Sequence, residues 1–123
     1  MDKKIRIMLV DDNTVIRQGL SMVFGQLSDI EVVGEATDGV KAVCLTRQIF
    51  PDVILMDIRM PNMDGIEATR VIHSEFPYIR IIGFSMYDEN DQALAMISAG
   101  AIAFRSKGDP IDLLLSAIRD KVD

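Results

Sequence analysis

The sequence lacks the features that would direct it to a membrane or to an oxidising compartment. Among its 123 residues there is one cysteine, Cys44, so no internal disulfide can form, which suits a reducing cytoplasm. No apolar stretch approaches the roughly 20 residues that a membrane span requires. The opening Met-Asp-Lys-Lys has no apolar segment behind it of the kind found in secretory signals. We therefore expect a cytoplasmic protein without membrane contact.

Basic runs, low-complexity segments and internal repeats are also missing. The net charge is −6, from 19 acidic and 13 basic residues, which disfavours direct binding of nucleic acid by these residues. A hydrophobic content of 49% is enough to fill a sizeable core. The length fits one domain, residues 1–123.

Short apolar runs alternate with helical patterns along the chain. Several runs, such as VILM, are apolar at successive positions, as expected for parallel strands that are covered on both faces. The predicted strands are residues 5–10, 31–36, 52–56, 79–84 and 101–105. Right-handed crossovers then give a (βα)5 doubly wound α/β fold, flavodoxin-like, with a five-stranded parallel sheet in the order 2-1-3-4-5.

Helix boundaries are indicated by capping residues. Asp38 and Asp64 are suited to cap the second and third helices. Asp109 is expected to cap the last helix, with Pro110 at its first position, and Gly100 is expected to end the fourth. In that fourth helix, which follows residues 88–91, the spacing predicts that residues 94 and 97 (both apolar) point inward.

Three acidic residues come directly after predicted strands. Asp11 and Asp12 follow the first strand, and Asp57 follows the third. Loops beyond the carboxyl ends of parallel strands converge on one crevice, so these carboxylates should meet there. Because crowded like charges are unfavourable without a cation, the cluster predicts a hard divalent ion, with Asp57 a candidate acceptor or nucleophile beside it. Taken singly, Asp12 could equally cap the helix that begins near Thr14, and Asp57 could simply start a turn.

Two further polar residues reach the same edge of the predicted sheet. Ser85 ends the fourth strand and Lys107 lies just past the fifth. A hydroxyl and an ammonium facing an aspartate would complete a site for phosphoryl transfer, in which cations neutralise the phosphoryl oxygens. Alone, Ser85 reads as a strand-end cap and Lys107 as a solvated surface residue. Their significance comes from the shared location.

With these residues in place, the whole chain resembles a response-regulator receiver domain of bacterial two-component signalling. The acidic pair DD, the run MDIRMPNMDG around Asp57, the FSM at Ser85 and the AGAIAFRSK ending at Lys107 agree in order and spacing. The resemblance implies that Asp57 is phosphorylated by a phosphohistidine on a sensor histidine kinase or by a small phosphodonor. Asp12 and Asp57 would bind Mg²⁺ (or Mn²⁺) directly, Asp11 would act through water, and the backbone carbonyl of Arg59 would supply another oxygen.

The resemblance also implies a switch. Lys107 would pair with the phosphoryl group, and Ser85 would hydrogen-bond it and move inward. Phe104, at the family's switch-aromatic position, would then rotate inward and alter the face formed by the fourth helix, fifth strand and fifth helix. From the residues alone, Phe104 is equally well one more core aromatic. Many family members have a proline with a cis peptide after the lysine, whereas this chain has Gly108, so the resemblance does not predict the conformation of the Lys107–Gly108 peptide.

The sequence segments around Asp57 and Ser85 are most similar to those of the subgroup whose regulators carry a C-terminal helix-turn-helix (LuxR/FixJ-type) output domain. This implies transcription regulation, with DNA contacted only through an output domain that is absent from the sequence, and it is compatible with a homodimer. Such a module is not a turnover enzyme, although it would phosphorylate and dephosphorylate itself. Arg59 and Tyr87 would flank the acyl phosphate and are hypothesised to hinder its hydrolysis, whereas His73 is expected at the surface.

Three other functions share part of this pattern. A Mg²⁺-dependent phosphatase of the haloacid-dehalogenase type needs a D-x-D pattern after the first strand, which Asp11-Asp12-Asn13 lacks. An FMN carrier shares the fold but needs a phosphate-binding loop where this chain has carboxylates. A phosphorylation-independent binding module would not need every phosphoryl-site residue. These observations favour the receiver.

Overall fold

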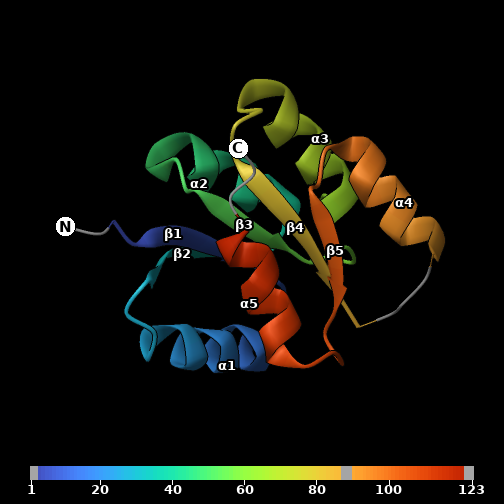
Figure 1. Ribbon diagram of the computed structural model, residues 1–123. Helices are drawn as coiled ribbons and strands as arrows, with labels where there is room; N and C mark the ends of the chain where they lie inside the picture. The colour runs from blue at the N-terminus through green and yellow to red at the C-terminus, as the bar shows by residue number, and fades with distance from the viewer. Residues whose placement is uncertain (1–2, 87–89, 121–123) are drawn as a thin grey trace.

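The computed structural model describes residues 3–86 and 90–120, and these form alternating strands and helices (Figure 1). The strands are β1 (Ile5–Val10), β2 (Ile30–Ala36), β3 (Val53–Met56), β4 (Arg80–Ser85) and β5 (Ala103–Ser106). The helices are α1 (Thr14–Gly25), α2 (Gly39–Ile49), α3 (Gly65–Glu75), α4 (Asn90–Ala99) and α5 (Ile111–Arg119).

All neighbouring strands run parallel, in the order β2-β1-β3-β4-β5. The predicted fold class and strand order are confirmed. The boundaries of β1 match the prediction, and those of the other strands differ from it by at most two residues. The central strands β1 and β3 each pair with a neighbour on both sides, and their carboxyl ends are in register, with Val10 paired to Met56. That register brings the residues after both strands to the same edge.

Successive side chains of β1 point into two separate cores, one on each face of the sheet. Met8 packs in a core that α2, α3 and α4 cover, and Ile7 packs in one that α1 and α5 cover. Figure 1 shows these two layers of helices on opposite sides of the strands. Both faces are buried, which explains why the strand sequences are apolar at successive positions rather than alternating.

Helix starts follow the sequence prediction in two places and depart from it in two others. Asp38 and Asp64 cap α2 and α3 by accepting backbone N–H bonds, as predicted. The cap of α1 is Asn13, whose side chain accepts from the N–H groups of residues 15 and 16. The capping alternative for Asp12 is therefore wrong. In α5 the cap position is Pro110, without a side-chain bond, because Asp109 bends back to accept from the N–H of residue 106.

The inward face of α4 was predicted incorrectly. Leu94 and Ile97 are exposed, and Met96 and Ala99 are buried instead. The apolar spacing was ambiguous because residues 93–97 are apolar at every position, so two helix faces fitted the pattern equally well. The stop signal was correct: Gly100 has a φ of +123°, a left-handed conformation that glycine adopts without strain.

Two single residues complete the description of the helices. Cys44 lies exposed on α2, and His73 is half-buried rather than fully at the surface, with its ring against Gly100. No helix within residues 3–86 and 90–120 is both long and apolar enough to cross a membrane.

Candidate metal and phosphoryl site at the carboxyl edge of the sheet

Strand pairing brings three carboxylates together where β1 and β3 end. The N–H of Asp57 donates to the carbonyl of Val10 at 2.9 Å, and the N–H of Asp11 donates to that of Ala36 at 3.0 Å. One oxygen each from Asp11, Asp12 and Asp57 lies within 4.8 Å of the others, with Asp12 exposed and the other two buried. An all-oxygen, mainly carboxylate set open on one side is the donor chemistry that Mg²⁺ or Mn²⁺ takes from proteins. The residues present fit such a cation.

The same carboxylates line an open cleft of about 300 Å³. Ser85, Lys107 and Arg59 border it too, so the residues singled out in the sequence for phosphoryl chemistry lie around one space. Ser85 is 2% exposed at the end of β4, which places its hydroxyl in the wall of the cleft rather than on the surface. The cleft is therefore both charged and walled by buried polar groups.

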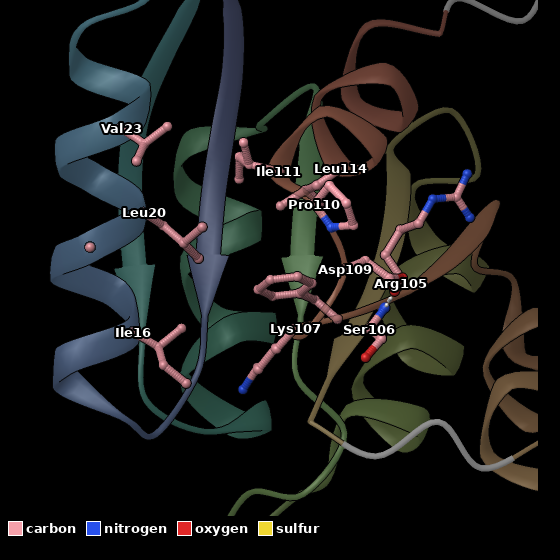
Figure 2. Close-up of a pocket in the computed structure, with 12 residues that line it drawn as sticks. Ile16, Leu20, Val23, Arg105, Ser106, Lys107, Asp109, Pro110, Ile111 and Leu114 are labelled. Carbon is pink, nitrogen blue, oxygen red and sulfur yellow. Dashed lines mark hydrogen bonds between the residues drawn. The ribbon is translucent and has the colours of Figure 1, made fainter.

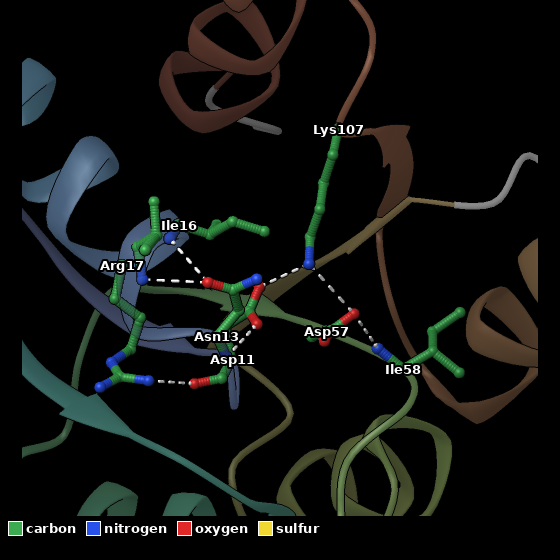
Figure 3. A network of polar contacts seen from close by, with 8 residues as sticks. Asp11, Asn13, Ile16, Arg17, Asp57, Ile58 and Lys107 are labelled. Atoms are coloured by element: carbon green, nitrogen blue, oxygen red, sulfur yellow. Dashed lines mark hydrogen bonds and ion pairs between the residues drawn. The ribbon is translucent and has the colours of Figure 1, made fainter.

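Lys107 reaches across this cleft and pairs more closely with Asp11 than with Asp57 (Figure 3). Its Nζ lies 2.6 Å from Asp11 Oδ2 and 3.5 Å from Asp57 Oδ1, and its side chain is 8% exposed. The N–H of Lys107 donates to the carbonyl of Ser85 at 2.8 Å, which anchors its backbone to β4. The sequence pointed to an ammonium facing Asp57, whereas the structure shows Asp11 holding that ammonium.

A second hollow lies behind Lys107, between α1 and α5 (Figure 2). It is a cavity of about 370 Å³ whose lining is mostly apolar and includes Leu20, Phe84 and Leu114. Lys107 borders both hollows, and Figure 2 shows its ammonium extending away from Leu114. The ammonium lies 5.8 Å from the centre of the Phe84 ring. An apolar wall behind the stem favours the extended side chain that delivers the charge to the carboxylates.

The carboxyl group of Asp57 is perturbed by its surroundings. Burial and the neighbouring charge of Asp11 raise its pKa to about 6, and Lys107 and the N–H of Ile58 oppose the rise. Ile58 donates to Asp57 Oδ1 at 2.9 Å. A cation would add to the opposing effects, because a positive charge favours the ionised form. Asp57 is thus poised to be a carboxylate when the cluster holds a metal.

Phe104 is half-buried on β5 and lies over Gly83 of β4. A Cβ at residue 83 would stand 2.7 Å from Phe104 Cδ1, so the missing side chain makes room for the ring. This glycine, two residues before Ser85, was not recognised from the sequence. Its place links the strand that carries Ser85 to the position of Phe104.

Gly65 is a second functional position that sequence reasoning missed. A Cβ there would stand 1.9 Å from the backbone oxygen of Asp57, far inside any allowed contact, and the N–H of Gly65 donates to the carbonyl of Ile58 at 2.8 Å. The glycine in MDG therefore lets α3 begin directly against the Asp57 backbone. The MDG motif was the feature of the sequence that could have identified Gly65, because a glycine at the start of a helix does not by itself indicate a close backbone contact.

Two further points concern the residues around the cleft. Arg59 lies exposed beside the cleft, and Tyr87 lies outside the described residues, so the hypothesis that the pair hinders hydrolysis stays a prediction. No cis peptide bond occurs in the described part of the chain, so the Lys107–Gly108 peptide, whose conformation the sequence left open, is trans.

A parallel α/β sheet with an aspartate cluster and a lysine at its carboxyl edge defines a class of signalling domain. The family model described as the response regulator receiver domain matches residues 7–119, so the chain belongs to this family. The alternatives of a dehalogenase-type phosphatase and of an FMN carrier are thereby set aside.

The relatives include transcriptional regulators. The chain is 41% identical to the transcriptional regulatory protein LiaR of Bacillus subtilis, over 94% of this chain and 54% of LiaR. It is 33% identical to the transcriptional regulatory protein DegU of Brevibacillus brevis, over 96% of this chain and 50% of DegU. The chain thus spans about half the length of these curated relatives.

Solved structures give the same result. A LuxR-family two-component response regulator from Aurantimonas sp. superposes with a TM-score of 0.86 at 36% identity, covering 93% of this chain and 82% of that one. The response regulator domain of Thermotoga maritima CheB gives a TM-score of 0.82 at 34% identity, covering 94% and 89%. The resemblance to the LuxR-type subgroup, drawn from the sequence, is confirmed.

Proposed function

We propose that this receiver is a phosphorylation-controlled switch in which Asp57 accepts a phosphoryl group from a phosphohistidine of a sensor histidine kinase. The observation that carries the proposal is the position of Asp57, 7% exposed, with two other carboxylates and the Lys107 ammonium grouped around it. An Asp57 oxygen would attack phosphorus, the P–N bond would break with its electron pair staying on the imidazole, and the imidazole would take up a proton. The product is an acyl phosphate on Asp57.

The acidic cluster would hold Mg²⁺ (or Mn²⁺) during this transfer. Asp12 and Asp57 would bind it directly, Asp11 through water, and the backbone carbonyl of Arg59 would complete the protein ligands. The bound ion would neutralise phosphoryl oxygens as charge moves in the transition state. The exposure of Asp12 supports its role as the ligand that faces an incoming ion.

Lys107 would exchange partners when the phosphoryl group arrives. Its ammonium is 2.6 Å from Asp11 and 3.5 Å from Asp57, so a short movement transfers it to a phosphoryl oxygen. Ser85 would donate to another oxygen, and Phe104 would follow inward, changing the α4–β5–α5 face. The close packing of Phe104 against Gly83 supports a coupling between Ser85 and Phe104, because a movement of β4 would displace the ring.

The altered face would control an output domain or a partner, and the output would be transcription regulation. The named function of LiaR and DegU supports this, as does the match to only half of their length. In this proposal residues 1–123 are the receiver and DNA is reached through a further domain. A cytoplasmic location and a homodimer are part of the same proposal.

The test is labelling with acetyl phosphate, followed by mass spectrometry of the intact chain and its peptides. Wild type should gain one phosphoryl group on Asp57 only when Mg²⁺ is present, and Asp57→Ala should gain none. Asp112→Ala, which removes an exposed carboxylate from α5, is the matched control and should label like wild type. Equal labelling of Asp57→Ala would contradict the proposal, and no labelling of wild type would favour a phosphorylation-independent binding module.

A further inference from the structure

We propose that Arg17 is a positioning residue for the metal site: it holds the peptide group between Asp11 and Asp12 and so aims the Asp12 carboxylate at the cation. This inference rests on the cation site of the proposed function. Arg17 touches none of the reacting atoms itself. Its NH1 donates instead to the backbone carbonyl of Asp11 at 2.6 Å, as Figure 3 shows.

The guanidinium of Arg17 contacts three residues at once. Besides the Asp11 carbonyl, its Nε donates to Glu35 Oε1 of β2 at 3.1 Å, and its NH2 lies 3.4 Å from the hydroxyl of Thr14 at the start of α1. The Arg17 side chain is 13% exposed, unlike its partner Glu35 at 44%. A planar, forked group that is mostly buried has little freedom to reorient. Its bonds therefore hold the loop that follows β1 in a fixed position relative to β2 and α1.

Each polar group of Asp11 has its own anchor. Its N–H donates to Ala36, its carboxylate accepts from the N–H of Asn13 at 2.9 Å and from Lys107, and its carbonyl accepts from Arg17. The carbonyl of Asp11 and the N–H of Asp12 belong to the same rigid peptide plane. Fixing the Asp11 carbonyl therefore fixes the orientation of the peptide group that leads into Asp12. Asp12 is exposed, so it has little packing of its own to set that direction.

Positioning and simple electrostatics predict opposite results when Arg17 loses its charge. Arg17 donates to the backbone of Asp11, a residue of the cluster, and a positive charge near the cluster repels a divalent cation. By charge alone, its removal should therefore tighten Mg²⁺ binding. If Arg17 aims Asp12, its removal should weaken binding. Changes to groups that orient metal ligands typically reduce metal affinity by about 10- to 100-fold. The sign of the change therefore separates the two roles.

The experiment measures the Mg²⁺ dissociation constant of the whole chain by calorimetry, with amide NMR shifts of residues 11 and 12 as the local readout. Arg17→Gln removes the charge and the fork, and Arg17→Lys keeps the charge but cannot reach both Asp11 and Glu35. The matched control is Arg47→Gln, because Arg47 also pairs with a glutamate, Glu75, but on the surface between α2 and α3. Urea unfolding in EDTA reports any change in stability separately.

We expect Arg17→Gln and Arg17→Lys each to weaken Mg²⁺ binding by about tenfold or more, with Arg47→Gln within about twofold of wild type. Arg17→Lys retains helix propensity and charge, so it gives the answer if Arg17→Gln does not fold. Unchanged or tighter binding by Arg17→Gln, or wild-type binding by Arg17→Lys, overturns the inference. A wild-type chain that binds no Mg²⁺ overturns the cation site as well and is recognised as that distinct failure.

Discussion

At the scale of single residues, the site combines burial with crowded negative charge. Asp57 is placed beside Asp11 with one shared cation, Lys107, which lies closer to Asp11. That arrangement is unfavourable for an ionised Asp57 in the metal-free chain, as its raised pKa indicates. A bound cation would relieve this crowding of negative charge. Stability and function should therefore oppose each other at this residue.

The first prediction follows from the sign of this pKa shift. The folded chain keeps a proton on Asp57 up to about pH 6, whereas the unfolded chain releases it near 3.8. Between these values the folded state binds more protons, so this group's contribution to stability falls as pH rises through the window. In EDTA at pH 7.5, Asp57→Asn should be about 1–2 kcal/mol more stable than wild type, after allowance for solvent screening.

Urea unfolding at pH 4 and pH 7.5 is the measurement. The advantage of Asp57→Asn should shrink toward pH 4, and Asp112→Asn on the exposed side of α5 should show no such dependence. A stability gain that is the same at both pH values would show that the ionisation of Asp57 is not its source.

At the scale of elements, the start of α1 separates a structural residue from a candidate ligand. Asn13 makes the capping bonds, and the adjacent Asp12 makes none, which leaves the Asp12 carboxylate available. Asn13→Ala should lower the free energy of unfolding by about 1 kcal/mol, the usual effect of losing an N-cap. Asp12→Ala should leave metal-free stability unchanged or higher but abolish tight Mg²⁺ binding. Thermal unfolding with EDTA and with Mg²⁺ distinguishes the two, and equal loss of stability in both variants would contradict the assignment.

Two helix glycines should respond in opposite ways to the same substitution. Gly19 in α1 has open space where a Cβ would lie, so Gly19→Ala should stabilise the chain by about 0.5–1 kcal/mol through helix propensity. Gly65→Ala would place a methyl against the Asp57 carbonyl and should destabilise by about 2–3 kcal/mol or more. Chemical denaturation measures both. A tolerated Gly65→Ala with unchanged labelling of Asp57 would show that α3 shifts freely.

At the scale of the whole molecule, the candidate metal ligands Asp11, Asp12 and Asp57 follow β1 and β3, so a bound ion would join the carboxyl ends of the two paired central strands. Anything that binds only the folded state stabilises it, by about 2.7 kcal/mol at 100 times its dissociation constant. Mg²⁺ at that ratio should raise the free energy of unfolding by about this amount in wild type. The double variant Asp11→Asn with Asp12→Asn should gain almost nothing, and an equal gain would place the ion elsewhere.

Activation should also be visible in the whole molecule. Beryllofluoride with Mg²⁺ should shift amide NMR signals of β4, α4 and β5 more than those of β2. Ser85 lies on β4 and Phe104 on β5, whereas β2 is at the opposite edge of the sheet. Light scattering of the same samples reports whether dimerisation accompanies the change. Shifts confined to the residues around Asp57 would contradict a switch that reaches Phe104.

Much of this was predictable because the governing interactions are local or repeat along the chain. Apolar runs such as VILM identified strands buried on both faces, and capping by Asp38 and Asp64 was evident because a cap bonds N–H groups only a few residues away. The pattern failed in α4, where consecutive apolar residues let Leu94 and Ile97 look internal. It failed at Asp109 because two local bonds compete for that carboxylate, and it accepts from the N–H of residue 106, three residues back, instead of capping α5.

Alternation of strand and helix leaves few topologies, so the fold class, the strand order and the edge of the sheet at which Asp11, Asp12 and Asp57 gather were predictable from the sequence. Three contacts became known only from the folded structure: the closer pairing of Lys107 with Asp11, the approach of the Asp57 backbone to Gly65, and the bond from Arg17 to the Asp11 carbonyl. Those contacts join residues from separate elements at distances of a few ångströms. No pattern within one element carries that information, because it depends on how the elements pack.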